Sequence, residues 1–66
     1  MGTNEKLALS VTEAAAVLGI SRPMVYRLIR SEGFPVFQVG GRRLISRAGL
    51  EAWVASQAET QKEVNL

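Results

Sequence analysis

The chain has 66 residues, of which 47% are hydrophobic, and it contains neither cysteine nor histidine. This length allows one small domain, and the composition excludes disulfides, thiolate–zinc sites and histidine general bases, so we expect no metal, no cofactor and no enzymatic activity. No apolar run approaches the ~18 residues of a membrane span and no signal peptide is evident, so we expect a cytoplasmic protein without a membrane or small-molecule partner.

The net charge of +2 is distributed unevenly along the chain. Residues 22–47 carry a net charge of +5, whereas residues 1–21 carry −1 and residues 48–66 carry −2. All cations of the basic middle segment are arginines: Arg22, Arg27, Arg30, Arg42, Arg43 and Arg47. Arginine is the cation whose shape best fits phosphates and guanine edges, so this segment favours a nucleic-acid partner.

The first predicted element is a helix over residues 11–18, and we expect a flexible N-terminus at residues 1–8. Ser10 and Glu13 have the spacing of a capping box, in which each side chain accepts a hydrogen bond from the other residue's backbone N–H. Gly19 follows the helix at the position where glycine tolerates a positive φ. The sequence therefore predicts a short helix with defined ends.

A second helix is predicted from Arg22 to Arg30 or Ser31, with Ser21 as its cap and Gly33 at its end. Its apolar side, which would pack on the first helix, consists of Val25, Leu28 and Ile29. Its opposite side carries Arg22, Tyr26, Arg27 and Arg30. Two helices joined by a short turn around a glycine have the spacing of a helix-turn-helix.

A β-hairpin is predicted next, because VFQV and RRLI flank the pair Gly40-Gly41. The turn sets four cross-strand pairs: Val39 with Arg42, Gln38 with Arg43, Phe37 with Leu44, and Val36 with Ile45. Val39–Arg42 and Phe37–Leu44 would share one face of the hairpin. Gln38–Arg43 and Val36–Ile45 would share the opposite face. Alternation alone leaves open which face meets the core.

The last predicted element is a third helix, which Ser46 would cap. Its apolar stripe consists of Leu50, Trp53 and Val54. We expect Trp53 to close the core over the first two helices. The folded domain would then span residues 9–57, with a polar C-terminal tail at residues 58–66.

The second helix is the candidate DNA-contacting element, because one α-helix fits a major groove about 12 Å wide. Ser21 and Arg22 stand at its start, where side chains reach base edges, and Arg22 can form two hydrogen bonds to guanine. Tyr26 can offer its hydroxyl to a phosphate and its ring to a thymine methyl group. Arg27 and Arg30 lie further along and would hold backbone phosphates.

Two of these side chains have an alternative interpretation. Tyr26 could pack against the hairpin instead of contacting DNA. Arg30 could form a surface ion pair with Glu32 or Glu13. Each alternative would remove one contact from the candidate interface.

The hairpin tip is a second candidate contact. Gly40 and Gly41 let the backbone approach a duplex closely, and Arg42 or Arg43 can enter a minor groove, whose negative potential attracts arginine. A tight turn alone would also account for the two glycines. Arg47 begins the third helix against the preference of the helix dipole, which a nearby phosphate would explain.

From Leu9 to Val54 the chain resembles the excisionase-type winged helix-turn-helix family, which is related to the DNA-binding domains of MerR-type regulators. The motifs that carry the resemblance are LSVTEAA, LGIS, VYRLI, FPVFQVGGRRLI and LEAWV. It implies a mainly α fold with a small β-hairpin: a helix-turn-helix, a two-stranded wing and a third helix. Gln38 departs from the family, which often has a basic residue at this position.

The resemblance also implies a function. The second helix would enter the major groove of double-stranded DNA and the wing the minor groove, in an architectural factor that bends DNA and directs recombination of a prophage or transposon. Such a protein would be bacterial or phage-encoded and nucleoid-associated, with a site-specific recombinase (integrase) or neighbouring copies of itself as partners. The alternatives are a MerR-like regulator of transcription, or a fragment of one, and a winged-helix module that binds protein.

Overall fold

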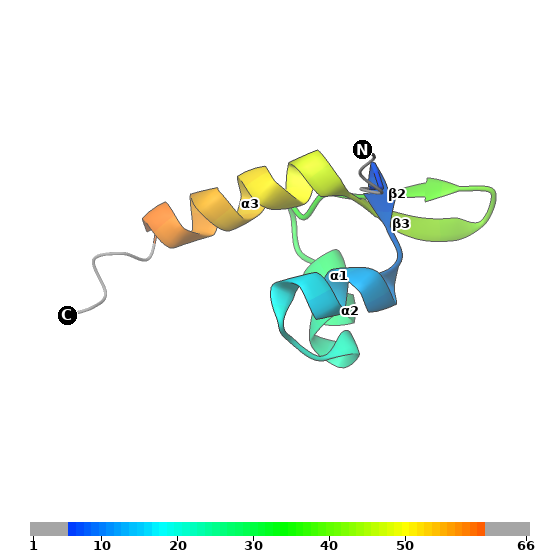
Figure 1. The fold of residues 1–66 in the computed structure, drawn as a ribbon, viewed down its shortest axis with the longest axis horizontal. Coiled ribbons are helices and arrows are strands. Elements are labelled where there is room, and N and C mark those ends of the chain that lie inside the picture. Colours follow the sequence, from blue (N-terminus) through cyan, green and yellow to red (C-terminus); the bar gives the residue numbers. More distant parts are fainter. Residues whose placement is uncertain (1–5, 61–66) are drawn as a thin grey trace, which may run out of the picture.

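The computed structural model describes residues 6–60 and contains a helix pair, a small sheet and a third helix (Figure 1). The elements follow in the order β1 (Ala8–Leu9), α1 (Val11–Leu18), α2 (Arg22–Ile29), β2 (Val36–Val39), β3 (Arg42–Ser46) and α3 (Arg47–Thr60). The α1–α2 pair lies on one side of the sheet, and α3 continues directly from β3. The predicted fold, mainly α with a two-stranded wing, is confirmed.

The predicted ends of α1 and α2 are present in the structure. The Ser10 Oγ accepts from the Glu13 N–H at 3.1 Å, and the Glu13 Oε1 accepts from the Ser10 N–H at 2.9 Å, which completes the capping box. Gly19 ends α1 with a φ of 75°. Ser21 caps α2 by accepting from the Met24 N–H at 3.3 Å. Gly19 and the Ser21 cap therefore define the two ends of the turn between the helices.

Glu13 also joins the N-terminal segment to α1, because its Oε2 lies 2.6 Å from the Lys6 Nζ. The hydrogen bond from Lys6, followed by that from the Ser10 backbone, lowers the pKa of Glu13 from its usual value of 4.5. The ionised carboxylate is thus favoured in the folded state, and protonation weakens both contacts.

Replacing Glu13 with glutamine should destabilise the domain at neutral pH and have no such effect in acid. The carboxylate's contribution to the free energy of unfolding is fully present above pH 4.5 and is lost as the pH falls through the lowered pKa of the folded state. Urea unfolding of both proteins at several pH values measures the difference. A gap between their midpoints that persists in acid would contradict the assignment.

The sheet has three antiparallel strands in the order β1-β3-β2, and its hairpin register is the predicted one. The sequence analysis does not predict β1: it places residues 1–8 in a flexible N-terminus, whereas the structure pairs Ala8 with Ser46 and Leu9 with Ile45. The Leu7 C=O also accepts from the Arg47 N–H at 2.9 Å. These bonds make β3 the central strand.

The burial of β3 residues shows which face of the hairpin meets the core. Ile45 is fully buried, and its cross-strand partner Val36 packs against the core. The buried residues of the core are Leu9, Ala14, Ala15, Val25, Phe34, Ile45 and Leu50. Phe37 and Val39 consequently lie on the outer face and are exposed. The core is therefore a thin layer between the helix pair and the sheet.

The third helix is held at its N-terminal end. The Ser46 Oγ accepts from the Gly49 N–H at 3.0 Å, and a Cβ on Gly49 would lie 2.7 Å from the Pro35 Cβ, so the glycine permits close packing here. Trp53 packs edge-on against Phe34, with ring centroids 5.1 Å apart. The helix runs to Thr60, within the predicted polar tail, whose residues 61–66 lie outside the described residues.

Candidate nucleic-acid interface

The exposed side of α2 carries the cations that the sequence analysis singles out. Its buried side is anchored by Val25, which is fully buried, while Leu28 and Ile29 are partly buried against the core. The side chains of Arg22, Tyr26, Arg27 and Arg30 are all exposed, as is the cap residue Ser21. The helix thus packs through one stripe and presents a basic surface to solvent.

The sequence analysis left open whether Arg30 forms an ion pair with Glu32 or Glu13 and whether Tyr26 packs against the hairpin. Glu13 pairs with Lys6, and within residues 6–60 no ion pair involving Arg30 is found. Tyr26 remains 47% exposed, so its ring is not enclosed by the hairpin. Both side chains are therefore accessible to a partner.

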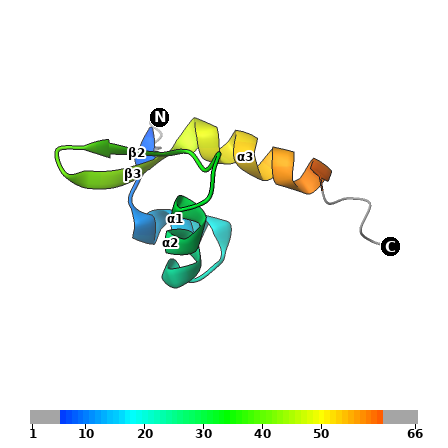
Figure 2. The ribbon, with the colours of Figure 1, turned by 180° about the vertical axis from the view of Figure 1, so that it is seen from behind.

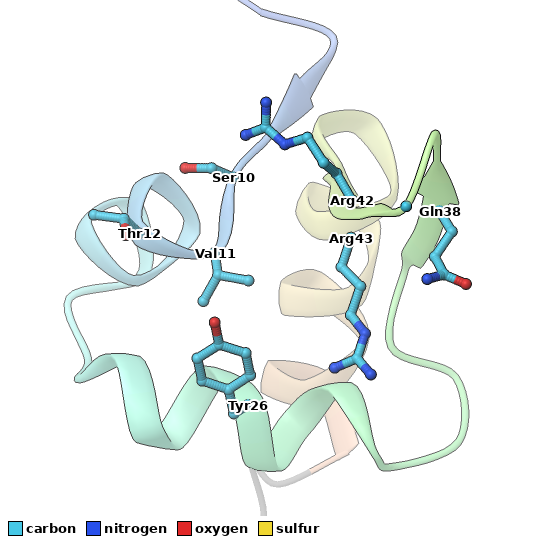
Figure 3. Close-up of a pocket in the computed structure, with 8 residues that line it drawn as sticks. Ser10, Val11, Thr12, Tyr26, Gln38, Arg42 and Arg43 are labelled. Atoms are coloured by element: carbon cyan, nitrogen blue, oxygen red, sulfur yellow. The ribbon is translucent and has the colours of Figure 1, made fainter.

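The wing, comprising β2, the Gly40-Gly41 turn and β3, projects away from the helix pair (Figure 2). Gly40 has a φ of 55° and Gly41 a φ of 84°, values that favour glycine at both turn positions. Arg42 and Arg43 follow the turn and are exposed. Because successive residues of a strand alternate between faces, the two guanidinium groups leave the wing in different directions, as Figure 3 shows.

An open hollow of about 550 Å³ lies between the wing, α2 and the first turn of α1 (Figure 3). Its lining comprises Ser10, Val11, Thr12, Tyr26, Gln38, Gly41, Arg42 and Arg43. The Arg43 side chain extends toward α2, and the Arg42 guanidinium extends toward the Ser10 side. The structure therefore brings Tyr26 of α2 and both wing arginines to one concave surface.

The sequence analysis missed four lining residues, namely Ser10, Val11, Thr12 and Gln38. Gln38 could have been found, because the predicted register already places it opposite Arg43 on the same face. The first turn of α1 could not, since its position beside the wing depends on how the helix pair packs on the sheet. The missed residues extend the surface from α2 to the N-terminus of α1.

Arg47 is not part of this hollow. It is half-buried at the start of α3, and its Nε lies 3.8 Å from the Glu51 Oε2, one helical turn further along. Arg47 thus forms a salt bridge on the surface of α3. The sequence analysis explains the position of this cation by a nearby phosphate. The predicted phosphate contact of Arg47 stays a prediction.

The helix pair, the wing and the third helix together define a winged helix-turn-helix domain with a basic concave face. Residues 8–58 match the family model of the helix-turn-helix domain. The chain belongs to this family, which includes excisionase-type DNA-binding proteins, and it is a DNA-binding domain. Comparisons with curated proteins and with solved structures return no match.

Among residues 6–60 no group of three acidic, cysteine or histidine side chains is placed to hold a metal ion. None of the helices in this part of the chain combines the length and apolar character needed to cross a bilayer.

Proposed function

We propose that the protein binds duplex DNA with α2 in the major groove and the wing in the adjacent minor groove, as an excisionase-like architectural factor. The observation that supports this most is the shared hollow, where Tyr26 of α2 faces the same space as Arg42 and Arg43 of the wing. Two cationic elements on one side of the domain suit one polyanion.

The residue roles follow from positions along α2. Ser21 and Arg22 lie at its N-terminus, which reaches base edges first when a recognition helix enters the groove. Arg27 and Arg30 lie further along and would contact phosphates, which fix the register of the protein on the duplex. Tyr26 borders the hollow and would donate its hydroxyl to a phosphate. Base contact is thus assigned to the start of the helix.

The wing would follow the minor groove beside this site. Gly40 and Gly41 carry no side chain that would keep the turn from the duplex, and Arg42 and Arg43 flank the turn on its C-terminal side. Because their side chains diverge, we assign one to the groove and the other to a neighbouring phosphate. Gln38 lies on the same face of the wing as Arg43 and would contact the same stretch of the DNA backbone.

The architectural role is supported by the small size of the interface. About four or five phosphate contacts give only weak binding by one domain, so bent DNA or a protein neighbour would have to supply further affinity. A site-specific recombinase or a second copy of the chain bound alongside would be such a neighbour. In this proposal the protein sets the direction of a recombination reaction by shaping DNA.

Titration of labelled duplex DNA at several salt concentrations tests the proposal. The logarithm of the binding constant should fall with the logarithm of salt concentration with a slope near −4, because each neutralised phosphate contributes about −0.9. Absence of binding even at low salt would contradict the proposal. That result would favour a winged-helix module whose basic face binds an acidic protein.

A further inference from the structure

Pro23 is an exposed apolar residue in the first turn of α2. A proline does not weaken the helix at this position, because the first amides of a helix have no partner within it. The Ser21 side chain accepts instead from the Met24 N–H, at 3.3 Å. The helix therefore begins normally around Pro23, and its pyrrolidine ring lies open to solvent.

The position of Pro23 around the helix places it opposite the core. Successive residues of an α-helix are about 100° apart, so Pro23 lies about 200° from Val25, which is fully buried. Arg27 and Arg30 follow one and two helical turns later and share this direction. These three residues, called here the outer ridge of α2, are all exposed.

The flanks of the outer ridge carry two other exposed side chains. Tyr26 lines the hollow toward the wing. Met24 is 40% exposed and falls on the opposite side of the ridge from Tyr26. Among the exposed residues of α2, Pro23 is thus the apolar one that points most directly away from the core.

The chemistry of the major groove suits this ring to one group. With α2 in the groove, the outer ridge near the helix N-terminus would face the base edges. Those edges carry hydrogen-bond donors and acceptors together with one apolar group, the C5 methyl group of thymine. The ring of Pro23 has neither donor nor acceptor, so a polar base edge beneath it would lose water without gaining a hydrogen bond. A methyl group meets no such penalty.

Rigidity also favours Pro23 for an apolar contact. Its side chain loses no rotamer freedom on burial, whereas a methionine such as Met24 loses several rotamers. The proline ring also fixes its own φ, so the helix holds it in a defined place beside Arg22. A methyl group on a neighbouring base pair would therefore meet a preorganised apolar surface.

We propose that Pro23 contacts the C5 methyl group of a pyrimidine beside the guanine that Arg22 would bind. The protein then prefers thymine at this position and binds 5-methylcytosine more tightly than cytosine, so that methylation of the DNA strengthens its binding. The proposal rests on the proposed function, which it deepens by naming a chemical group on the DNA. A role of Pro23 in starting the helix would by itself give no such preference.

Pairs of duplexes that differ by one C5 methyl group test the contact in the unmodified protein. In the site selected from a random duplex library, each thymine is replaced by uracil and each cytosine by 5-methylcytosine, one at a time. At one pyrimidine beside a guanine the methylated form should bind about fourfold more tightly, as expected for removing one methyl group from water. Equal affinities in every pair would overturn the proposal.

Three variants identify the side chain responsible. Pro23→Ser, which suits the start of a helix, should bind both members of that pair equally. Met24→Ala is the matched control: it removes an exposed apolar side chain from the same turn and should retain the ratio. Tyr26→Ala should weaken binding to both members and also retain it. A ratio that persists in Pro23→Ser, or is lost in either other variant while circular dichroism shows it folded, would overturn the proposal.

The outcomes separate this inference from the proposed function. Binding to duplex DNA without any methyl-dependent pair would overturn the contact of Pro23 and leave the proposed function intact. Absence of binding to every duplex would contradict both. The ratio should also stay constant as salt is raised, because a methyl contact releases no counterions, and a ratio that falls with salt would overturn the assigned contact.

Discussion

Replacing Arg22 with alanine should weaken the preference of the protein for its best DNA sequence while the domain stays folded. Arg22 is exposed at the first position of α2, and its removal takes away a guanidinium that can form two hydrogen bonds to guanine. The loss should be about 1–3 kcal/mol of discrimination at the contacted base pair. Selection of bound sequences from a random duplex library, followed by affinity measurements, gives this value.

Arg30→Ala is the matched control for that experiment. Arg30 is also an exposed arginine of the same helix, at its C-terminal cap, and we assign it to a phosphate. Its removal should weaken binding to all duplexes similarly and reduce the salt slope by about 1. If Arg30→Ala relaxed sequence preference and Arg22→Ala did not, the assigned orientation of α2 in the groove would be wrong.

Replacing Ile45 with alanine should unfold most of the protein near physiological temperature. Ile45 is fully buried at the centre of the sheet, where it is paired with both Leu9 and Val36. Truncation of such a side chain costs about 2–5 kcal/mol, whereas a domain this small has about 3–5 kcal/mol in total. Thermal unfolding followed by circular dichroism measures the shift, at about 4–8 °C per kcal/mol.

Ile45→Val tests whether packing is the cause. It removes one methylene group and should cost about 0.5–1.5 kcal/mol, with the fold retained. A tolerated alanine at this position would mean that the helix pair and the sheet do not depend on a common core at β3. The positions of α2 and the wing relative to each other would then lose their support.

The local structure of this chain was predictable because its signals are short-range. The capping box of Ser10 and Glu13, the positive φ of Gly19 and the hairpin register around Gly40-Gly41 each depend on residues a few positions apart. The exposed basic side of α2 followed from the spacing of its apolar residues. These features concern one element at a time.

What the sequence left open depends on contacts between distant elements. Strand β1 has two residues, too few to show an alternation of polar and apolar side chains. Its partner strand β3 also lies far from it in the sequence. The inward face of the hairpin is fixed by the burial of Ile45, which alternation does not determine. Gly49 weakens a helix when considered alone, but here it lets α3 pack on Pro35. The hollow arises from the same tertiary packing.

Amide chemical-shift mapping during titration with duplex DNA would show whether α2 and the wing bind one duplex together. We expect perturbed amides at residues 21–30 and at 40–43, with further changes in the first turn of α1 beside the hollow. These shifts should follow one binding curve. Perturbations confined to α3, or to α2 without the wing, would contradict joint binding of α2 and the wing to one duplex.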